Sequence, residues 1–131
     1  MDPRDATPVA VAVVEHAGAV LIGPRPEGAP LAGYWEFPGG KVRDRESADE
    51  AAQRECLEET GMKIHIERTC AVVEHDYDHG TVRLHFFLAR PRDPDQPPRA
   101  PFRWVPIAQL DEYRFPAANA AVLRELNSPS G

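Results

Sequence analysis

The sequence predicts a single α/β domain in which a mixed β-sheet lies between helices. Valine-rich apolar runs of strand length recur along the chain, and two separate segments have helical patterns. The resulting order of strands, helix, strands and helix favours a mixed sheet with a helix packed on each face. The 131 residues suit one domain, so we expect a core at about 8–126 with flexible polar tails at both ends.

The N-terminal third is expected to form two strands followed by a loop. The apolar runs at 9–15 and 19–22 are broken by His16-Ala17-Gly18, which predicts a tight turn. The segment 24–33 contains three prolines and two glycines and is expected to be a loop.

The first helix is expected between Ser47 and Gly61. Ser47 suits the N-cap, and Glu50, three residues later, completes a capping box. Gly61 suits the left-handed position that ends a helix. The interior contains no glycine or proline and is rich in alanine, which favours a helix throughout.

The C-terminal half alternates apolar segments with turns. Three strands are expected, at 63–74, 81–89 and 102–106. The first two are joined by a turn at 76–80, and the proline-rich segment 90–101 is expected to be a surface loop. A second helix is expected at 116–126, where apolar residues recur at three-residue steps.

Three carboxylates are expected on one face of the first helix. Glu55, Glu58 and Glu59 have the spacing i, i+3 and i+4, at which like charges repel one another. A divalent cation would relieve that repulsion, and hard oxygen ligands suit Mg²⁺ or Mn²⁺. The alternative is an acidic helix face that is merely solvated.

Composition excludes several classes of partner. The net charge of −6 argues against stable binding to nucleic acid, whose phosphates an acidic surface repels. Cys56 and Cys70 lack metal-ligand spacing and are expected to be buried free thiols. No apolar run reaches about 18 residues and no signal peptide is visible, so we expect a cytoplasmic protein without a membrane span. A monomer is the expected state.

The run from Gly40 to Met62 matches one extended motif. It reads G-x5-E-x7-R-E-U-x-E-E-x-G-U, where U is apolar, with every fixed position filled. The chain therefore resembles the Nudix hydrolases, which cleave nucleoside diphosphates linked to another group. This resemblance implies an α/β/α Nudix sandwich and a metal held by Glu55, Glu58, Glu59 and the carbonyl of Gly40. Catalysis would depend on these glutamates and on Arg54, which would fix the rotamer of one of them.

Segments outside the motif resemble the MutT type of Nudix hydrolase, which removes oxidised nucleotides. The lead-in 32–41 is similar, and 115–119 reads F-P-A-A-N. The resemblance implies an enzyme that converts a nucleoside triphosphate such as 8-oxo-dGTP to the monophosphate and pyrophosphate. Arg25 would contact phosphate, Phe37 would form an apolar wall, and Asn119 would bind the base edge. A solvated Arg25 and a helix-capping Asn119 are the alternatives.

The general base and the substrate stay open at this point. MutT-type enzymes offer an acid from the loop before the last strand, but here 99–104 contains none, and Asp93 and Asp95 are the nearest carboxylates. Glu58 or Glu59 could serve instead. The other polar candidates lie around the 76–80 turn; they are His75, Tyr77 and His79. Alternative substrates are CTP or methylated pyrimidine nucleotides, dinucleoside polyphosphates and capped RNA, and a non-catalytic nucleotide sensor is the alternative of another class.

Overall fold

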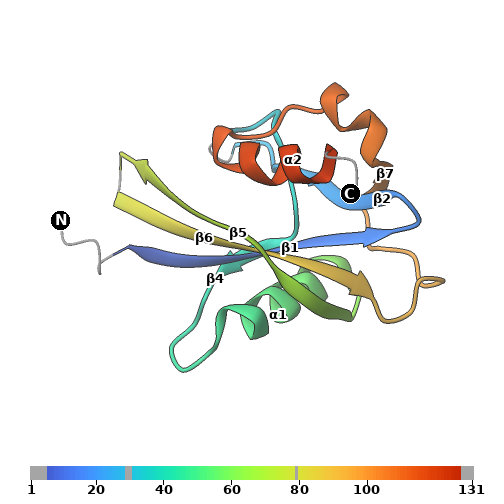
Figure 1. Ribbon diagram of the computed structural model, residues 1–131, viewed down its shortest axis with the longest axis horizontal. Coiled ribbons are helices and arrows are strands. Elements are labelled where there is room, and N and C mark those ends of the chain that lie inside the picture. The colour runs from blue at the N-terminus through green and yellow to red at the C-terminus, as the bar shows by residue number, and fades with distance from the viewer. Residues whose placement is uncertain (1–5, 29–30, 79, 128–131) are drawn as a thin grey trace.

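The computed structural model describes residues 6–28, 31–78 and 80–127, and it has three layers (Figure 1). A mixed sheet lies between helix α1 on one face and helix α2 on the other, which confirms the predicted α/β class. The strands are β1 (Thr7–His16), β2 (Ala19–Pro24), β3 (Trp35–Glu36), β4 (Gly39–Lys41), β5 (Ile64–Tyr77), β6 (Gly80–Pro91) and β7 (Arg103–Pro106). The helices are α1 (Ala48–Thr60), α2 (Ala120–Asn127) and two 3₁₀ turns, η2 (Ile107–Glu112) and η3 (Ala117–Asn119).

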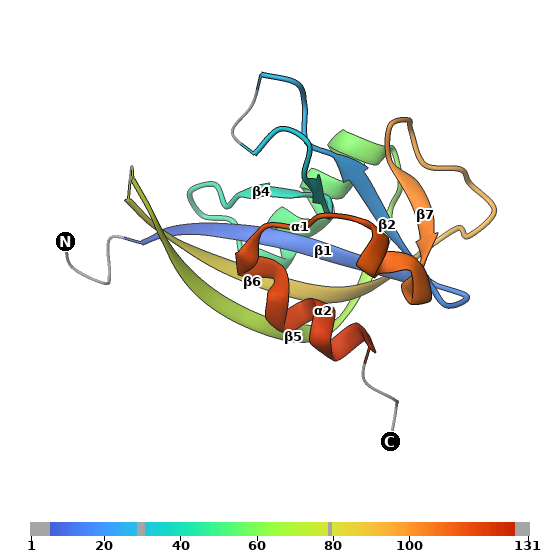
Figure 2. The same cartoon turned by 90° about the horizontal axis from the view of Figure 1, so that it is seen from above.

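Strand β1 organises the sheet. The main strand order is β3-β2-β1-β6-β5, in which β1 and β6 are parallel and the other neighbours are antiparallel. The first half of β1 also pairs with β4, and β2 also pairs with β7. Figure 2 shows α2 crossing above this sheet while α1 lies beneath it. Strand β4, which contains the start of the motif, is therefore paired directly with the central strand.

The alternating side chains of β1 separate two apolar clusters. Ala10 and Ala12 lie in the cluster that contains Ala51 and Ala52 of α1. Small side chains on both partners allow the helix and the strand to pack closely. Val11 and Val13, which alternate with these alanines, lie in the other cluster, with Val122 of α2. Both faces of β1 are thus buried, as its nearly continuous apolar sequence predicts.

Both ends of α1 are capped as predicted. The Ser47 hydroxyl accepts from the Glu50 amide, and the Glu50 carboxylate accepts from the Ser47 amide at 2.9 Å. Gly61 has φ +75°, and its amide donates to the carbonyl of Leu57 at 2.9 Å. The helix that carries the three glutamates therefore starts and ends where local sequence specifies.

Several predicted boundaries are wrong. The hairpin strands β5 and β6 reach Tyr77 and Gly80, so the turn is shorter than the predicted 76–80, and β6 continues into the predicted loop as far as Pro91. The predicted helix at 116–126 begins as the 3₁₀ turn η3 and becomes α-helical only at Ala120. The short strands β3 and β4 were not predicted, because two or three residues are too few to show periodicity.

Both cysteines are free, as expected. Burial raises the pKa of each thiol to about 11, so neither is a reactive thiolate near neutral pH. Cys56 is fully buried, whereas Cys70 is only partly covered, which corrects the expectation of two buried thiols. Within the described ranges, no helix has the length and apolarity needed to cross a membrane.

Candidate active site

The three glutamates of α1 are crowded next to strand β4. The carboxylate of Glu59 accepts a hydrogen bond from the amide of Gly39 at 3.0 Å. Burial, aided by neighbouring carboxylates, raises the pKa of Glu59 to about 7, although the Gly39 amide opposes this shift. Burial also raises the pKa of Glu55, against the influence of Arg54. Glu58 is the most accessible of the three, with 49% of its side chain exposed.

Arg54 links the motif loop to the helix. Its guanidinium binds both carboxylate oxygens of Glu46, at 2.7 and 2.9 Å, and donates to Glu55 at 2.9 Å. It also donates to the carbonyl of Lys41 at 3.1 Å. Hydrogen bonds from Arg54 and from the Arg43 amide lower the pKa of Glu46 to about 2. Arg54 thus contacts Glu46 and Glu55 at once, which is the arrangement that a positioning role requires.

Two adjacent glycines bring backbone and carboxylate together. A Cβ on Gly40 would overlap the carboxylate of Glu55. A Cβ on Gly39 would instead lie 2.5 Å from the carbonyl oxygen of Ala10. The absence of side chains at these positions therefore lets Glu55 and β1 approach β4 closely.

The donor set suits a hard divalent cation. Three carboxylates and the backbone of Gly40 are oxygen ligands of the kind that Mg²⁺ and Mn²⁺ bind. Burial first, and then neighbouring carboxylates, raises the pKa values of Glu55 and Glu59, and a bound cation would oppose that rise. Among the described residues, no three ligating side chains are close enough together to hold one metal ion. The Glu55 carboxylate binds Arg54 instead, and the Glu59 carboxylate binds the Gly39 amide. A cation would have to draw these side chains together.

A cavity of about 630 Å³ opens beside β4, and we call it the Asn119 cavity. It brings together residues that are far apart in sequence. The predicted substrate and loop residues among its lining are Arg25, Phe37, Gly40 and Asn119. Gly39 and Gly40 line it as well, so the cavity reaches the backbone amide that binds the Glu59 carboxylate.

Asn119 is buried but keeps its amide available. Only 9% of the residue is exposed, and within the described part of the chain its side chain forms no hydrogen bond. Its backbone amide closes the η3 turn by donating to the carbonyl of Pro116 at 3.0 Å. The amide atoms are accessible from the cavity, because no buried side-chain polar atom of the described residues lacks a partner. This geometry fits a side chain that binds a ligand in the cavity better than it fits a helix cap.

The walls of the Asn119 cavity are apolar on one side and charged on the other. Phe37 is 4% exposed and stacks on Phe115, with ring centroids 5.2 Å apart. Arg25 forms an ion pair with Glu36 at 3.1 Å, and burial raises the pKa of Glu36. Arg25 therefore lies at the cavity with a protein partner already bound.

The β5–β6 turn supplies further groups. Tyr77 and Asp78 line the Asn119 cavity, and the Tyr77 ring contacts that of His75 at 4.6 Å between centroids. His75 itself is not part of the lining. His79 lies outside the described residues.

A second cavity, of about 530 Å³, lies beneath α2. Its floor is apolar, and its rim carries the ion pair between Arg68 and Glu125 at 2.6 Å. It contains none of the predicted site residues. The Asn119 cavity is therefore the one that adjoins the acidic helix.

Comparison with known proteins agrees with this geometry. The model of the NUDIX domain family matches residues 9–125. The chain belongs to the Nudix hydrolase family. By homology it is a pyrophosphohydrolase, and Nudix hydrolases typically use a divalent metal.

Three similar proteins illustrate the range of the family. An 8-oxo-dGTP diphosphatase of Proteus vulgaris is 34% identical over 88 residues, which cover 67% of this chain and 79% of that protein. A CTP pyrophosphohydrolase of Escherichia coli is 35% identical over 77 residues, covering 59% and 57%. The solution structure of the E. coli ORF135 protein has a TM-score of 0.76 and 27% identity, covering 91% of this chain and 86% of that one.

This Nudix hydrolase has site contacts that sequence reasoning missed. Glu36 binds Arg25, and Phe115 stacks on Phe37, although both lie within the segments that carried the resemblance. Arg99 donates to the carbonyl of Glu58 at 2.8 Å, across 41 residues. No local sequence pattern predicts such a contact. The only signal is the lack of a basic residue in the last turn of α1, because a positive charge stabilises the C-terminal end of a helix.

We predict that the 92–101 loop of this Nudix hydrolase supplies no general base. The carboxylate of Asp93 accepts from the Asp95 amide at 3.0 Å, so it stabilises its own turn, and both residues are exposed. Asp93→Asn and Asp95→Asn, alone and together, should leave kcat within a few-fold in a steady-state assay. A loss of about 10²-fold or more in the double variant would show that a loop carboxylate acts as the base.

Proposed function

We propose that this Nudix hydrolase is a Mg²⁺-dependent nucleoside triphosphate pyrophosphohydrolase that acts on oxidised purine nucleotides such as 8-oxo-dGTP. Water attacks the β-phosphorus, the bond from that phosphorus to the bridging oxygen of the α-phosphate breaks, and the products are nucleoside monophosphate, pyrophosphate and a proton. The protein would thereby remove damaged nucleotides before they enter DNA.

One observation carries this proposal: Asn119, a largely buried residue whose side chain forms no hydrogen bond within the described part of the chain, lines a cavity that adjoins the acidic helix. An asparagine offers one acceptor and two donors, which can pair with neighbouring groups on a base edge. Phe37 lines the cavity, is supported from behind by its stacking on Phe115, and would provide an apolar surface for the base. A base held there would direct its phosphates toward Gly39, Gly40 and the glutamates.

Each remaining residue has a specific role in this proposal. Bound Mg²⁺ would supply electrostatic stabilisation of phosphate charge and a lower pKa for the attacking water. Glu55, Glu58, Glu59 and the Gly40 carbonyl would hold it. Glu58 or Glu59 accepts the proton of the water, while Arg54 keeps Glu55 and Glu46 in place. Arg25 exchanges Glu36 for a substrate phosphate.

The second candidate substrate is CTP. The E. coli relative named CTP pyrophosphohydrolase is similar to this chain, and cytosine also presents paired donor and acceptor groups to an amide. A dinucleoside polyphosphate is favoured only by the position of Tyr77 in the cavity lining. A screen of canonical, oxidised and methylated nucleoside triphosphates by kcat/KM distinguishes these substrates, and a preference for CTP would overturn the 8-oxo-dGTP assignment.

Asn119→Ala tests whether this residue recognises the base. Loss of a paired amide should cost roughly 1–3 kcal/mol of discrimination, because polar groups of the correct substrate lose their partners. We therefore expect kcat/KM for 8-oxo-dGTP to fall far more than that for dGTP, with a decrease in their ratio of about tenfold or more.

Asn127→Ala is a matched control in the same C-terminal region. Asn127 donates to the carbonyl of Leu123 at 3.0 Å at the exposed end of α2, so its removal should leave the ratio unchanged. If Asn119 is only a cap, Asn119→Ala should instead lower the melting temperature and weaken all substrates equally, at a cost of about 1 kcal/mol of stability.

A further inference from the structure

The last turn of α1 places negative charge where a helix tolerates it least. Glu58 and Glu59 lie in this turn, which contains no basic residue. The C-terminal end of a helix carries partial negative charge, and its last carbonyls have no partners within the helix. The turn that bears two of the proposed metal ligands therefore needs stabilisation from elsewhere in the chain.

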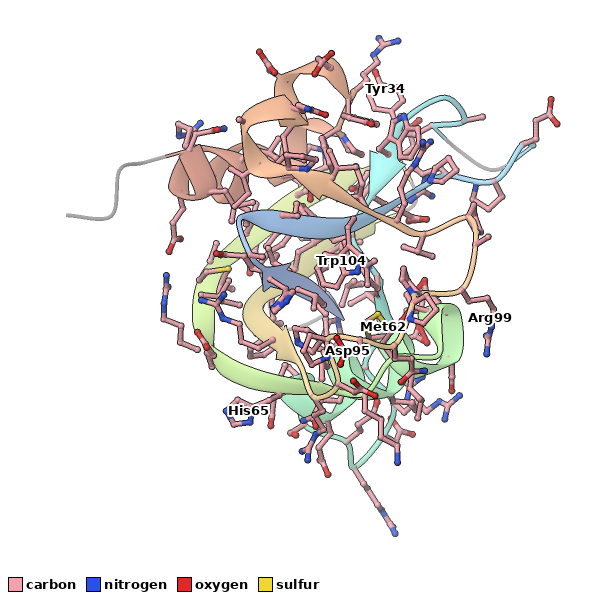
Figure 3. The ribbon with its side chains drawn as sticks, turned by 90° about the vertical axis from the view of Figure 1, so that its right-hand side faces the viewer. Tyr34, Met62, His65, Asp95, Arg99 and Trp104 are labelled. Atoms are coloured by element: carbon pink, nitrogen blue, oxygen red, sulfur yellow. The ribbon has the colours of Figure 1, made fainter. Side chains whose placement is uncertain are left out.

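The 92–101 segment provides that stabilisation. The Arg99 guanidinium donates to the carbonyl of Glu58 at 2.8 Å, and the Arg99 amide donates to that of Thr60, also at 2.8 Å. The side-chain amide of Gln96 donates to the carbonyl of Gly61 at 2.9 Å. Figure 3 shows Arg99 beside the end of α1. Three carbonyl oxygens at the helix end, those of Glu58, Thr60 and Gly61, are thus bound by one segment.

Gly61 ends the helix beside Arg99. Its φ is +75°, and a Cβ there would lie 3.4 Å from Nη2 of Arg99, at van der Waals distance. On the opposite side, Glu59 is held by the amide of Gly39 in β4. The last turn of α1 is therefore fixed between β4 and the 92–101 segment.

We propose that Arg99 is a positioning residue for Glu58 and Glu59: from the 92–101 segment, it holds the last turn of α1 so that both carboxylates face a shared cation and the substrate phosphates. The proposal rests on the metal-binding function proposed for α1. Arg99 binds a backbone carbonyl and is not among the residues that line the Asn119 cavity, so its proposed effect passes through the helix. A displacement of about 1 Å in a positioned group can cost about 10²-fold in rate.

Arg99→Met and Arg99→Lys test this role. The methionine variant retains much of the side-chain volume but loses the charge and the donors. We expect its kcat to fall about 10- to 100-fold and its half-saturating Mg²⁺ concentration to rise, with KM for the nucleotide nearly unchanged. Lysine can still donate to the Glu58 carbonyl, so Arg99→Lys should recover most of the lost rate.

Hydrogen exchange of the metal-free protein gives a readout that does not depend on turnover. Arg99→Met should speed amide exchange at the end of α1, in residues 57–61, while the strands keep their protection. Arg92→Met is the matched control, because Arg92 lies in the same segment but donates to the carbonyl of Ile64 in β5, at 3.2 Å. This control should retain kcat, Mg²⁺ dependence and exchange at the helix end.

Three results would overturn the proposal: unchanged kcat and Mg²⁺ dependence in Arg99→Met, equal losses in Arg99→Met and Arg92→Met, or faster exchange throughout the chain. Failure of the proposed function would show separately. In that case Glu58→Gln would leave the rate unchanged, whatever happened to exchange at the end of α1.

Discussion

Glu58→Gln should reduce kcat on the order of 10³-fold or more at saturating Mg²⁺. The substitution keeps the shape of the side chain and removes one of three crowded carboxylate charges. Loss of a metal ligand weakens the electrostatic stabilisation of the transferred phosphorus, which costs several kcal/mol in the barrier. Steady-state kinetics across a Mg²⁺ titration measures the loss and shows whether more metal restores the rate.

The fold should survive this substitution. Glu58 is half exposed and its ion pairs with Arg43 and Arg54 are long, at 3.6 and 3.4 Å, so they contribute little stability. Relief of repulsion along α1 acts in the opposite direction. Asp49→Asn, on an exposed residue in the first turn of the same helix, is the matched control and should retain wild-type kcat. Wild-type kcat in Glu58→Gln would exclude Glu58 as a ligand.

Two neighbouring glycine substitutions should have opposite consequences. In Gly40→Ala the new methyl group meets the mobile end of Glu55, which can turn away without disturbing the backbone. The protein should stay folded, but with Glu55 displaced we expect kcat to fall about 10²-fold, because its carboxylate no longer has the geometry that catalysis requires.

In Gly39→Ala the methyl group would clash with the backbone of β1, which cannot move without disturbing the sheet. It would lie 2.5 Å from the Ala10 oxygen and 3.0 Å from the Val11 Cα, in the central strand. Overpacking of this kind typically costs 1–3 kcal/mol or more, so the melting temperature should fall. Thermal unfolding together with kinetics separates the two variants. A Gly40→Ala protein that is strongly destabilised, or one that keeps full activity, would contradict the position assigned to Glu55.

Much of the catalytic helix could be predicted because its determinants are local. The capping box of Ser47 and Glu50, the stop at Gly61 and the common face of the three glutamates all depend on residues within one or a few helical turns. The supporting role expected for Arg54 came from the resemblance to the family, and its contact with both carboxylate oxygens of Glu46 spans eight residues. The strand runs also predicted the hairpin of β5 and β6, though not its length.

The sequence by itself determined the fold class, the acidic helix and its two ends, and the motif that marks the Nudix family. Only the tertiary structure decided which distant groups meet. Arg25 pairs with Glu36, Asn119 reaches the cavity beside Gly40, and Arg99 binds the end of α1. These pairs are 11 to 79 residues apart in the sequence, and the packing of turns and loops around the sheet brings them together. Helical periodicity and capping depend on residues a few positions apart, so they cannot predict which residues distant in the sequence lie close together in the fold.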